Sequence, residues 1–397
     1  MIAVRALQGF LGGAMIPMVF SVPYRLFPKH QQERCLIVLG LTATMAPTLG
    51  PVIGGWITES FSWRWIFLIN LPAALLVISG VWSFIDVDEP DSSVRRGFDV
   101  PGLVLMAIAL GSLQYALEEG PRWDWLDDES IRVALLVALV SGALFLRRIL
   151  VYSKPIIDIR ALRDRNLATG CVLSFIFGIG VYVPVYLLPL FLSQVRGYNA
   201  LQIGGTMFVL GVFQFLSAPV AAGLSKLIDL RAMLALGLAL FACGLWMNGF
   251  MNAEAAFTEL FWPQAIRGLA LMLCFVPINT LALGTVPEAR LANASGLYNL
   301  MRNLGGAIGI AAVNTAFETR HALHVARISE SPRLEWSAQA IAGSGAPEMA
   351  PGVDVQLLAN LIAREAAVMT YNDLFMAMGV AFAIAIAVMP LVRKAMR

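Results

Sequence analysis

The length and composition of this chain exclude an ordinary water-soluble protein. Of its 397 residues, 58% are hydrophobic and only 14% are charged, against about 45–50% and about 25% in soluble domains. So little charge cannot cover the surface of a soluble protein of this size. The net charge of +2 gives no reason to expect a nucleic-acid partner.

Apolar segments of about 20 residues, the length that a bilayer core requires, run through most of the chain. Because backbone polar groups in lipid must be satisfied internally, each segment is predicted to be a helix. The sequence therefore predicts an all-α integral membrane protein with about eleven transmembrane helices. In chain order they are expected at 2–24, 36–57, 66–85, 100–118, 131–151, 167–190, 201–224, 232–252, 260–284, 295–316 and 372–391.

A polar segment separates the last two expected helices. Residues 317–370 are predicted to form a periplasmic loop, within which 353–368 could be a short amphipathic helix. The histidines then fall in loops, where His321 and His324 are expected to be solvated rather than metal-bound. The sequence has no phosphate-binding loop, His-Glu-x-x-His or nucleophile elbow, so no metal, cofactor or enzymatic activity is expected.

Two parts of the chain carry similar patterns. The first expected helix opens with Arg5-Ala-Leu-Gln8-Gly9 and the ninth with Gln264-Ala-Ile-Arg267-Gly268, with the polar pair exchanged. At nearly the same offset, Gly40, Met45 and Gly50 correspond to Gly296, Met301 and Gly306. A duplicated half is therefore predicted, as in the parallel repeats of large transporters. Within the second half, three expected helices (167–190, 201–224 and 232–252) precede the ninth, so three are also expected before Arg5, giving fourteen in the full architecture.

At these residues the chain resembles the Major Facilitator Superfamily, specifically its 14-helix drug:proton antiporter family of the EmrB/QacA type. Arg5, Gln8 and Gly9 are similar to motif B of the superfamily, and the run from Ala46 to Gly55 resembles motif C, the antiporter signature. The resemblance implies that the first three helices are lacking. It divides the chain into helices 4–6 of the N-terminal six-helix half (1–98), two extra linking helices (99–165) and the C-terminal six-helix half (166–397), with a periplasmic loop at 317–370.

The motif C segment concentrates small residues on a helix. Gly50 and Gly54, and likewise Pro51 and Gly55, are spaced i and i+4 and share a helix face. Small faces let helix backbones approach closely, and a proline bends the helix. The family resemblance favours a seal that prevents leakage through the antiporter; the alternative is ordinary helix packing.

Three arginines lie within expected spans, where a charge costs about 2.5–3.5 kcal/mol on insertion scales. They must face the bundle interior, water or a partner. For Arg5, with Gln8 and Gly9, the resemblance implies a role in proton relay or gating; the alternative is an arginine that extends to the membrane interface. Gln264, Arg267 and Arg302 receive the same interpretation in the second half.

Several amides also lie in expected spans. Such groups either form hydrogen bonds between helices or line a transport cavity. The cavity candidates are Gln114, Gln214, Asn279 and Asn299.

Together these features predict a secondary transporter that exports amphipathic, often cationic compounds in exchange for protons. Its expected partners are membrane lipid, small lipophilic or cationic substrates, protons and, by resemblance, a periplasmic adaptor protein. No Asp or Glu falls in the middle of an expected span, and the resemblance implies that a carboxylate on the missing first helix carries the proton. Two alternatives stay open: an exporter of an organic acid, siderophore or other metabolite, and a non-transporting relic or assembly factor.

Basic residues predict the orientation in the cell inner membrane. Of the 28 Lys and Arg residues, 17 lie in one set of alternate loops and eight in the other, so the first set, with the C-terminus, is expected in the cytoplasm. A Ser344→Cys reporter in the expected outer loop should therefore react with a membrane-impermeant thiol reagent in intact cells. Labelling only after the cells are broken would show that this loop is cytoplasmic and that the orientation is the opposite one.

Overall fold

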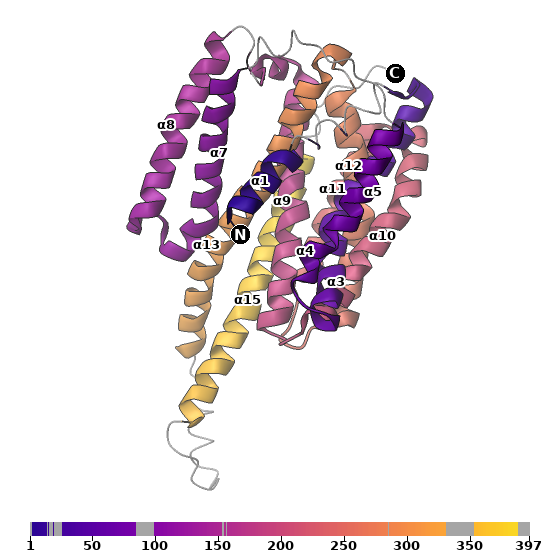
Figure 1. The fold of residues 1–397 in the computed structure, drawn as a ribbon. Coiled ribbons are helices and arrows are strands. Elements are labelled where there is room, and N and C mark those ends of the chain that lie inside the picture. Colours follow the sequence, from indigo (N-terminus) through magenta and orange to yellow (C-terminus); the bar gives the residue numbers. More distant parts are fainter. Residues whose placement is uncertain are drawn as a thin grey trace, which may run out of the picture.

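The computed structural model of the protein describes residues 2–13, 15, 19, 26–84, 99–152, 155, 157–284, 286–330 and 353–387. Over these ranges the regular structure is helical throughout and includes no strand (Figure 1). Eight of the described helices are long and apolar enough to cross a membrane. The predicted all-α membrane class is confirmed, whereas the number of eleven spans stays a prediction.

The C-terminal part forms a packed bundle around one central helix. That helix is α12 (Phe257–Leu283), most of whose side chains are buried. Its neighbours include α9 (Arg165–Gln194), α10 (Ala200–Leu227) and α11 (Leu230–Asn248). Helices α13 (Glu288–Ser329) and α15 (Val353–Ile386) complete the bundle and extend beyond the other helices at one end (Figure 1).

Among the described residues, the N-terminal part has one long helix and three shorter ones. Helix α3 (Lys29–Ser60) packs along α10 and also contacts α12. The other helices of this part are α1 (Ile2–Gly13), α4 (Trp65–Leu68) and α5 (Asn70–Phe84). The apolar side chains of α5 are exposed among the described residues, as expected for a helix in contact with lipid.

Polar residues in front of the apolar runs determine where several helices begin. Asp164 accepts hydrogen bonds from the first backbone amides of α9, and Asn199 forms a capping box with Gln202 at the start of α10. Asp128 caps α8 (Glu129–Val151). Hydrogen bonds from the Ser130 hydroxyl and, with a smaller effect, from the Ile131 amide hold the pKa of Asp128 below its usual value. This capping carboxylate therefore keeps its charge.

The predicted loop at 317–370 is wrong at both ends. Helix α13 continues to Ser329, and 353–368 is the beginning of α15 rather than a separate amphipathic helix; 331–352 lies outside the described residues. Some polar side chains at this end of α15 bond to other segments. Arg364 donates to the carbonyls of Val195 (3.1 Å) and Ala253 (2.8 Å), and the Tyr371 hydroxyl donates to Gln194 (2.8 Å). The apolar pattern therefore stops before the helices do.

Helices α7 (Val100–Glu119) and α8 form a hairpin at the side of the bundle (Figure 1). At its open end, Arg148 Nε donates to Asp99 Oδ1 at 2.6 Å, and the same oxygen caps α7 through the Gly102 amide at 2.9 Å. At its closed end are the short 3-10 helices η1 (Gly120–Trp123) and η2 (Trp125–Asp127). There Trp125 Nε1 donates to Thr315 Oγ1 of α13 at 3.0 Å.

The Asp99–Arg148 pair is expected to stabilise the packing of α7 against α8. The Asp99 side chain is 1% exposed and that of Arg148 29%. Asp99→Ala removes both a helix cap, worth about 1 kcal/mol, and the partner of a charge; breaking a fully buried pair costs about 3–5 kcal/mol. Thermal unfolding in detergent should show a clear loss for Asp99→Ala and a smaller one for Asp99→Asn, since Asn still caps.

The exposed pair Arg122–Glu119, at 3.8 Å, provides the matched control for that experiment. Arg122→Met should change the free energy of unfolding by less than about 1 kcal/mol. Equal effects of Arg122→Met and Asp99→Ala would contradict a structural role for the buried pair.

Candidate functional site

A buried arginine lies in the middle of the central helix α12. Arg267 is 1% exposed, and its Nη1 donates to Gln264 Oε1, one helical turn earlier, at 2.8 Å. Its guanidinium carbon lies 5.7 Å from the ring centroid of Phe241 on α11. Gln264 is itself fully buried, and its Nε2 lies 3.5 Å from Met207 Sδ on α10. A charge is thus held inside the bundle by an amide dipole and an aromatic face.

A second buried arginine on α13 repeats this arrangement. Arg302 is 8% exposed, and its Nη2 donates to Asn299 Oδ1 at 2.7 Å. Its guanidinium carbon lies 6.0 Å from the ring centroid of Phe275 on α12. Residues three apart lie on the same helix face, which explains why an amide precedes each arginine at that spacing. Among the described residues, Arg267 has no ion pair with a carboxylate.

Glycines make room for these arginines. A Cβ on Gly244 of α11 would lie 2.6 Å from Arg267 Cγ, and a Cβ on Gly178 of α9 would overlap the backbone carbonyl of Arg302. Gly268, next to Arg267, likewise faces the backbone of Leu210 on α10. Gly268 is part of the sequence repeat, whereas Gly178 and Gly244 could not be recognised from the sequence because glycine is common throughout this chain.

The motif C glycines divide between two faces of α3. A Cβ on Gly55 would overlap the carbonyl oxygen of Ala200 at the start of α10, and a Cβ on Gly204 would lie 2.9 Å from Val52 Cα. Gly50 and Gly54 have no heavy atom of another described segment within 4 Å of such a Cβ. The close contact expected of the whole motif therefore belongs to the Pro51–Gly55 face, which is rotated away from Gly54.

Motif B falls on helix α1. Arg5 is helical, but its side chain lies outside the described residues. Gln8 and Gly9 are exposed on α1, and a Cβ on Gly9 would meet no heavy atom within 4 Å. The relay or gating role of these three residues stays a prediction.

The four amide candidates have different environments. Gln214 is fully buried on α10, and Asn279 and Asn299 are 1% and 4% exposed. Asn279 Nδ2 donates to the Phe275 carbonyl at 2.8 Å, inside its own helix. Gln114 on α7 is exposed, so it is not a buried amide of the bundle as an amide within an expected span would suggest. Among the described helices, α13 packs on α7 of this hairpin, and most other side chains of α7 and α8 are exposed or half-buried.

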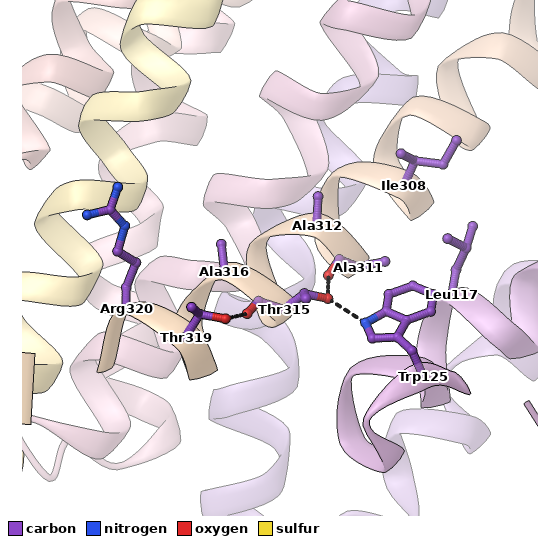
Figure 2. A pocket seen from close by; sticks show the side chains of 9 residues that line it. All are labelled: Leu117, Trp125, Ile308, Ala311, Ala312, Thr315, Ala316, Thr319 and Arg320. Atoms are coloured by element: carbon purple, nitrogen blue, oxygen red, sulfur yellow. Dashed lines mark hydrogen bonds between the residues drawn. The ribbon is translucent and has the colours of Figure 1, made fainter. Parts of the chain in front are cut away.

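A cavity of about 540 Å³ lies between the closed end of the hairpin and α13. Figure 2 shows its lining: Leu117 and Trp125 from the hairpin side, and a row of small side chains along α13 that ends at Arg320. The Trp125–Thr315 hydrogen bond crosses the cavity. Both Asp124 (φ 51°) and Trp125 (φ 57°) have left-handed backbones, a costly conformation outside glycine that positions the indole at this point.

An ionic cluster beside this cavity was missed by the sequence analysis. His324 Nε2 on α13 forms a hydrogen bond with Asp373 Oδ2 on α15 at 2.9 Å. Arg320 Nη1 lies 3.7 Å from the same oxygen. His321 and His324 are helical, so their expected place in a loop is wrong. Two signals were available: Asp373 lies at the end of the last expected span, and the i, i+4 spacing of Arg320 and His324 puts both on one helix face.

The rotation of α3 predicts which glycine substitution is harmful. Gly55→Leu would force its side chain into the Ala200 backbone, and overpacking costs about 1–3 kcal/mol. Gly54→Leu, one residue away, should change stability by less than about 0.5 kcal/mol. The thermal unfolding midpoints of both variants in detergent would test this difference, and equal loss in both would contradict the α3–α10 contact.

Comparisons with known proteins cover most of the chain. The Major Facilitator Superfamily model matches residues 1–310. The colistin resistance protein EmrB of Acinetobacter baumannii is 38% identical over 327 residues, which is 82% of this chain and 64% of that protein. The multidrug export protein EmrB of Escherichia coli K12 is 30% identical, with 82% and 64% covered. The chain thus spans just under two thirds of the length of these relatives.

Other matches agree with this family and with the fold. The fatty acid resistance protein FarB of Neisseria gonorrhoeae is 29% identical over 392 residues, or 97% of this chain and 76% of that protein. A solved bacterial homologue of human drug peptide transporters is 16% identical with a TM-score of 0.51, covering 97% of this chain and 83% of the other. That structure supports the fold alone. The superfamily predicted from the motifs is confirmed: this chain is a member of the Major Facilitator Superfamily, a family of membrane transporters and not of enzymes.

Proposed function

We propose that this chain belongs to a proton-coupled transporter of the cell inner membrane that exports amphipathic, often cationic compounds. The names of two relatives, a colistin resistance protein and a multidrug export protein, support toxic lipophilic substrates. The excess of basic residues in one set of loops supports a cytoplasmic C-terminus. Membrane lipid surrounds the exposed apolar faces, such as that of α5.

The contact between α3 and α10 is the observation that carries this proposal. Helix α3 lies in the expected N-terminal half and α10 in the C-terminal half, and they meet through Gly55 and Gly204. Alternating access is largely a rocking of one bundle against another around a fixed site. A face of small residues brings two backbones together without interlocking side chains, so the halves can close tightly and separate again.

The buried arginines contribute a fixed positive field to the transport path. An arginine does not lose its proton in a protein, so Arg267 and Arg302 orient and gate rather than carry protons. Gln264 and Asn299 hold them in one rotamer by the hydrogen bonds described above. Motif B on α1 would supply a third such group at Arg5.

Two further features support the assignment of linking helices and of a docking place for a partner protein. Helices α7 and α8 pack mainly on each other, which supports their assignment as two extra linking helices within 99–165. The ends of α13 and α15 that extend past the bundle (Figure 1) offer a place where a periplasmic adaptor protein would dock.

A second substrate class is long-chain carboxylic acids. It is favoured by one relative named for fatty acid resistance and by the guanidinium of Arg320, which lines the apolar cavity. Such compounds would make the protein an organic-acid exporter on the same fold.

Deletion of the gene from its host would test the export function. The deletion strain should become several-fold more sensitive to lipophilic cations, and wild-type protein should restore resistance. Arg267→Met should not restore it at equal membrane level, because the field of the arginine is lost, and Arg267→Lys should restore it only in part, because lysine lacks the planar fork. Arg231→Met, at the beginning of α11, serves as the control.

Three other outcomes would separate the alternatives. Sensitivity to fatty acids alone would favour the organic-acid exporter. Accumulation of a cell metabolite without any change in resistance would favour a metabolite exporter. No change in either property would favour a non-transporting relic or assembly factor.

A further inference from the structure

The cluster of Arg320, His324 and Asp373 joins two membrane helices by ionisable groups. His324 is buried, with its side chain 5% exposed, whereas Asp373 is 38% and Arg320 54% exposed. The imidazole therefore lies inside the α13–α15 contact, and the carboxylate connects it to the outside. Histidine serves as a proton shuttle in many proteins.

The bonding of His324 leaves one of its nitrogens free. Nε2 bonds to Asp373 at 2.9 Å, whereas Nδ1 is buried and makes no hydrogen bond with the described residues. A histidine that only fastened two helices would be expected to use both nitrogens, because a buried unpaired polar atom costs about 1–3 kcal/mol. Neutral imidazole has one nitrogen with a proton and one without, so this ring can accept one more proton.

Few charged groups face the cluster from the helices packed on it; on α13 itself the exposed Arg327 follows His324 by three residues. Helix α9, which packs on both α13 and α15, has no acidic or basic side chain between Arg165 and Arg196, only the phenols of Tyr182 and Tyr186. The one charged residue of α11, Arg231, is at its far end. His321, three residues before His324, bonds instead to the Ala363 carbonyl of α15 at 3.2 Å. On the hairpin side, Glu118 and Arg122 line a separate polar pocket with Glu318 and Tyr371.

We propose that His324 and Asp373 form a proton-binding site whose occupancy changes the charge beside the cavity. With neutral His324, the charges of Arg320 and Asp373 cancel. Proton binding gives an imidazolium paired with Asp373 and leaves the cluster with one net positive charge. Arg320 is the exposed member and also lines the cavity (Figure 2), so the added charge is felt there.

This charge links the proton to the substrate. A lipophilic cation in the cavity is disfavoured by one more positive charge nearby, and linkage makes the effect reciprocal: the cation must also disfavour the proton. Mutual exclusion of the two ligands is what exchange of a cation for a proton requires. The inference rests on the proposed function for its substrate class, but the proton site itself does not depend on it.

The proton site can be tested directly, because the chain has only three histidines. In the purified full chain labelled with nitrogen-15 histidine, the imidazole signal that disappears in His324→Gln belongs to His324. Its chemical shift should change with pH, and the change should require a lower pH in Asp373→Asn, where the imidazolium loses its counter-ion. His321→Gln is the matched control and should leave that titration unchanged. A His324 signal that does not titrate, or that ignores Asp373→Asn, overturns the proposal.

Binding of a lipophilic cation such as tetraphenylphosphonium tests the linkage. The wild-type chain should bind it at least about fivefold more weakly at about pH 5 than at about pH 8, and His324→Gln should bind it equally at both. The linkage is refuted if the wild-type chain binds the cation equally at both pH values, or if His324→Gln keeps the pH dependence of the wild type. Absence of cation binding at either pH refutes the cationic substrate class instead, while the histidine titration still decides the proton site.

Discussion

Close contact between helix backbones at glycine is the constraint on which the rest of this structure depends. Between lipid-embedded helices there is little hydrophobic driving force, so packing must come from short-range contact. Glycines on α9, α10, α11 and α12 meet the backbone of a neighbouring helix, and Gly305 of α13 faces the carbonyl of Phe175 in the same way. Without these approaches α12 would not be enclosed, and its arginine would face lipid.

The enclosure explains how charge is tolerated inside the bundle. Arg267 and Arg302 each bond to an amide three residues earlier and lie over a phenylalanine ring of a neighbouring helix. This arrangement satisfies part of each guanidinium through an amide and an aromatic ring. A buried charge is costly for stability, so its presence at the centre of the bundle points to function more than to packing.

A second polar layer lies where α13 and α15 leave the bundle. Hydrogen bonds from Arg364, Tyr371 and Asn372 connect α15 to α9 and to the turn between α11 and α12. They lengthen the helices past their apolar runs and bring Asp373 against His324. The ionic cluster is therefore a product of the same contacts that made the loop prediction fail.

The sequence by itself determined the class of this protein and the identity of its most unusual residues. Scarce charge and repeated apolar runs require membrane helices, because nothing else satisfies a backbone in lipid. The motif C run and the intramembrane arginines were likewise visible, since a charge or a glycine cluster in an apolar run is conspicuous. What only the tertiary structure decided is which residues meet: Gly55 rather than Gly54, His324 with Asp373 across 49 residues, and Trp125 with Thr315 across 190. Those pairs depend on the rotation of each helix about its axis, which packing against neighbours determines and a single helix's sequence does not.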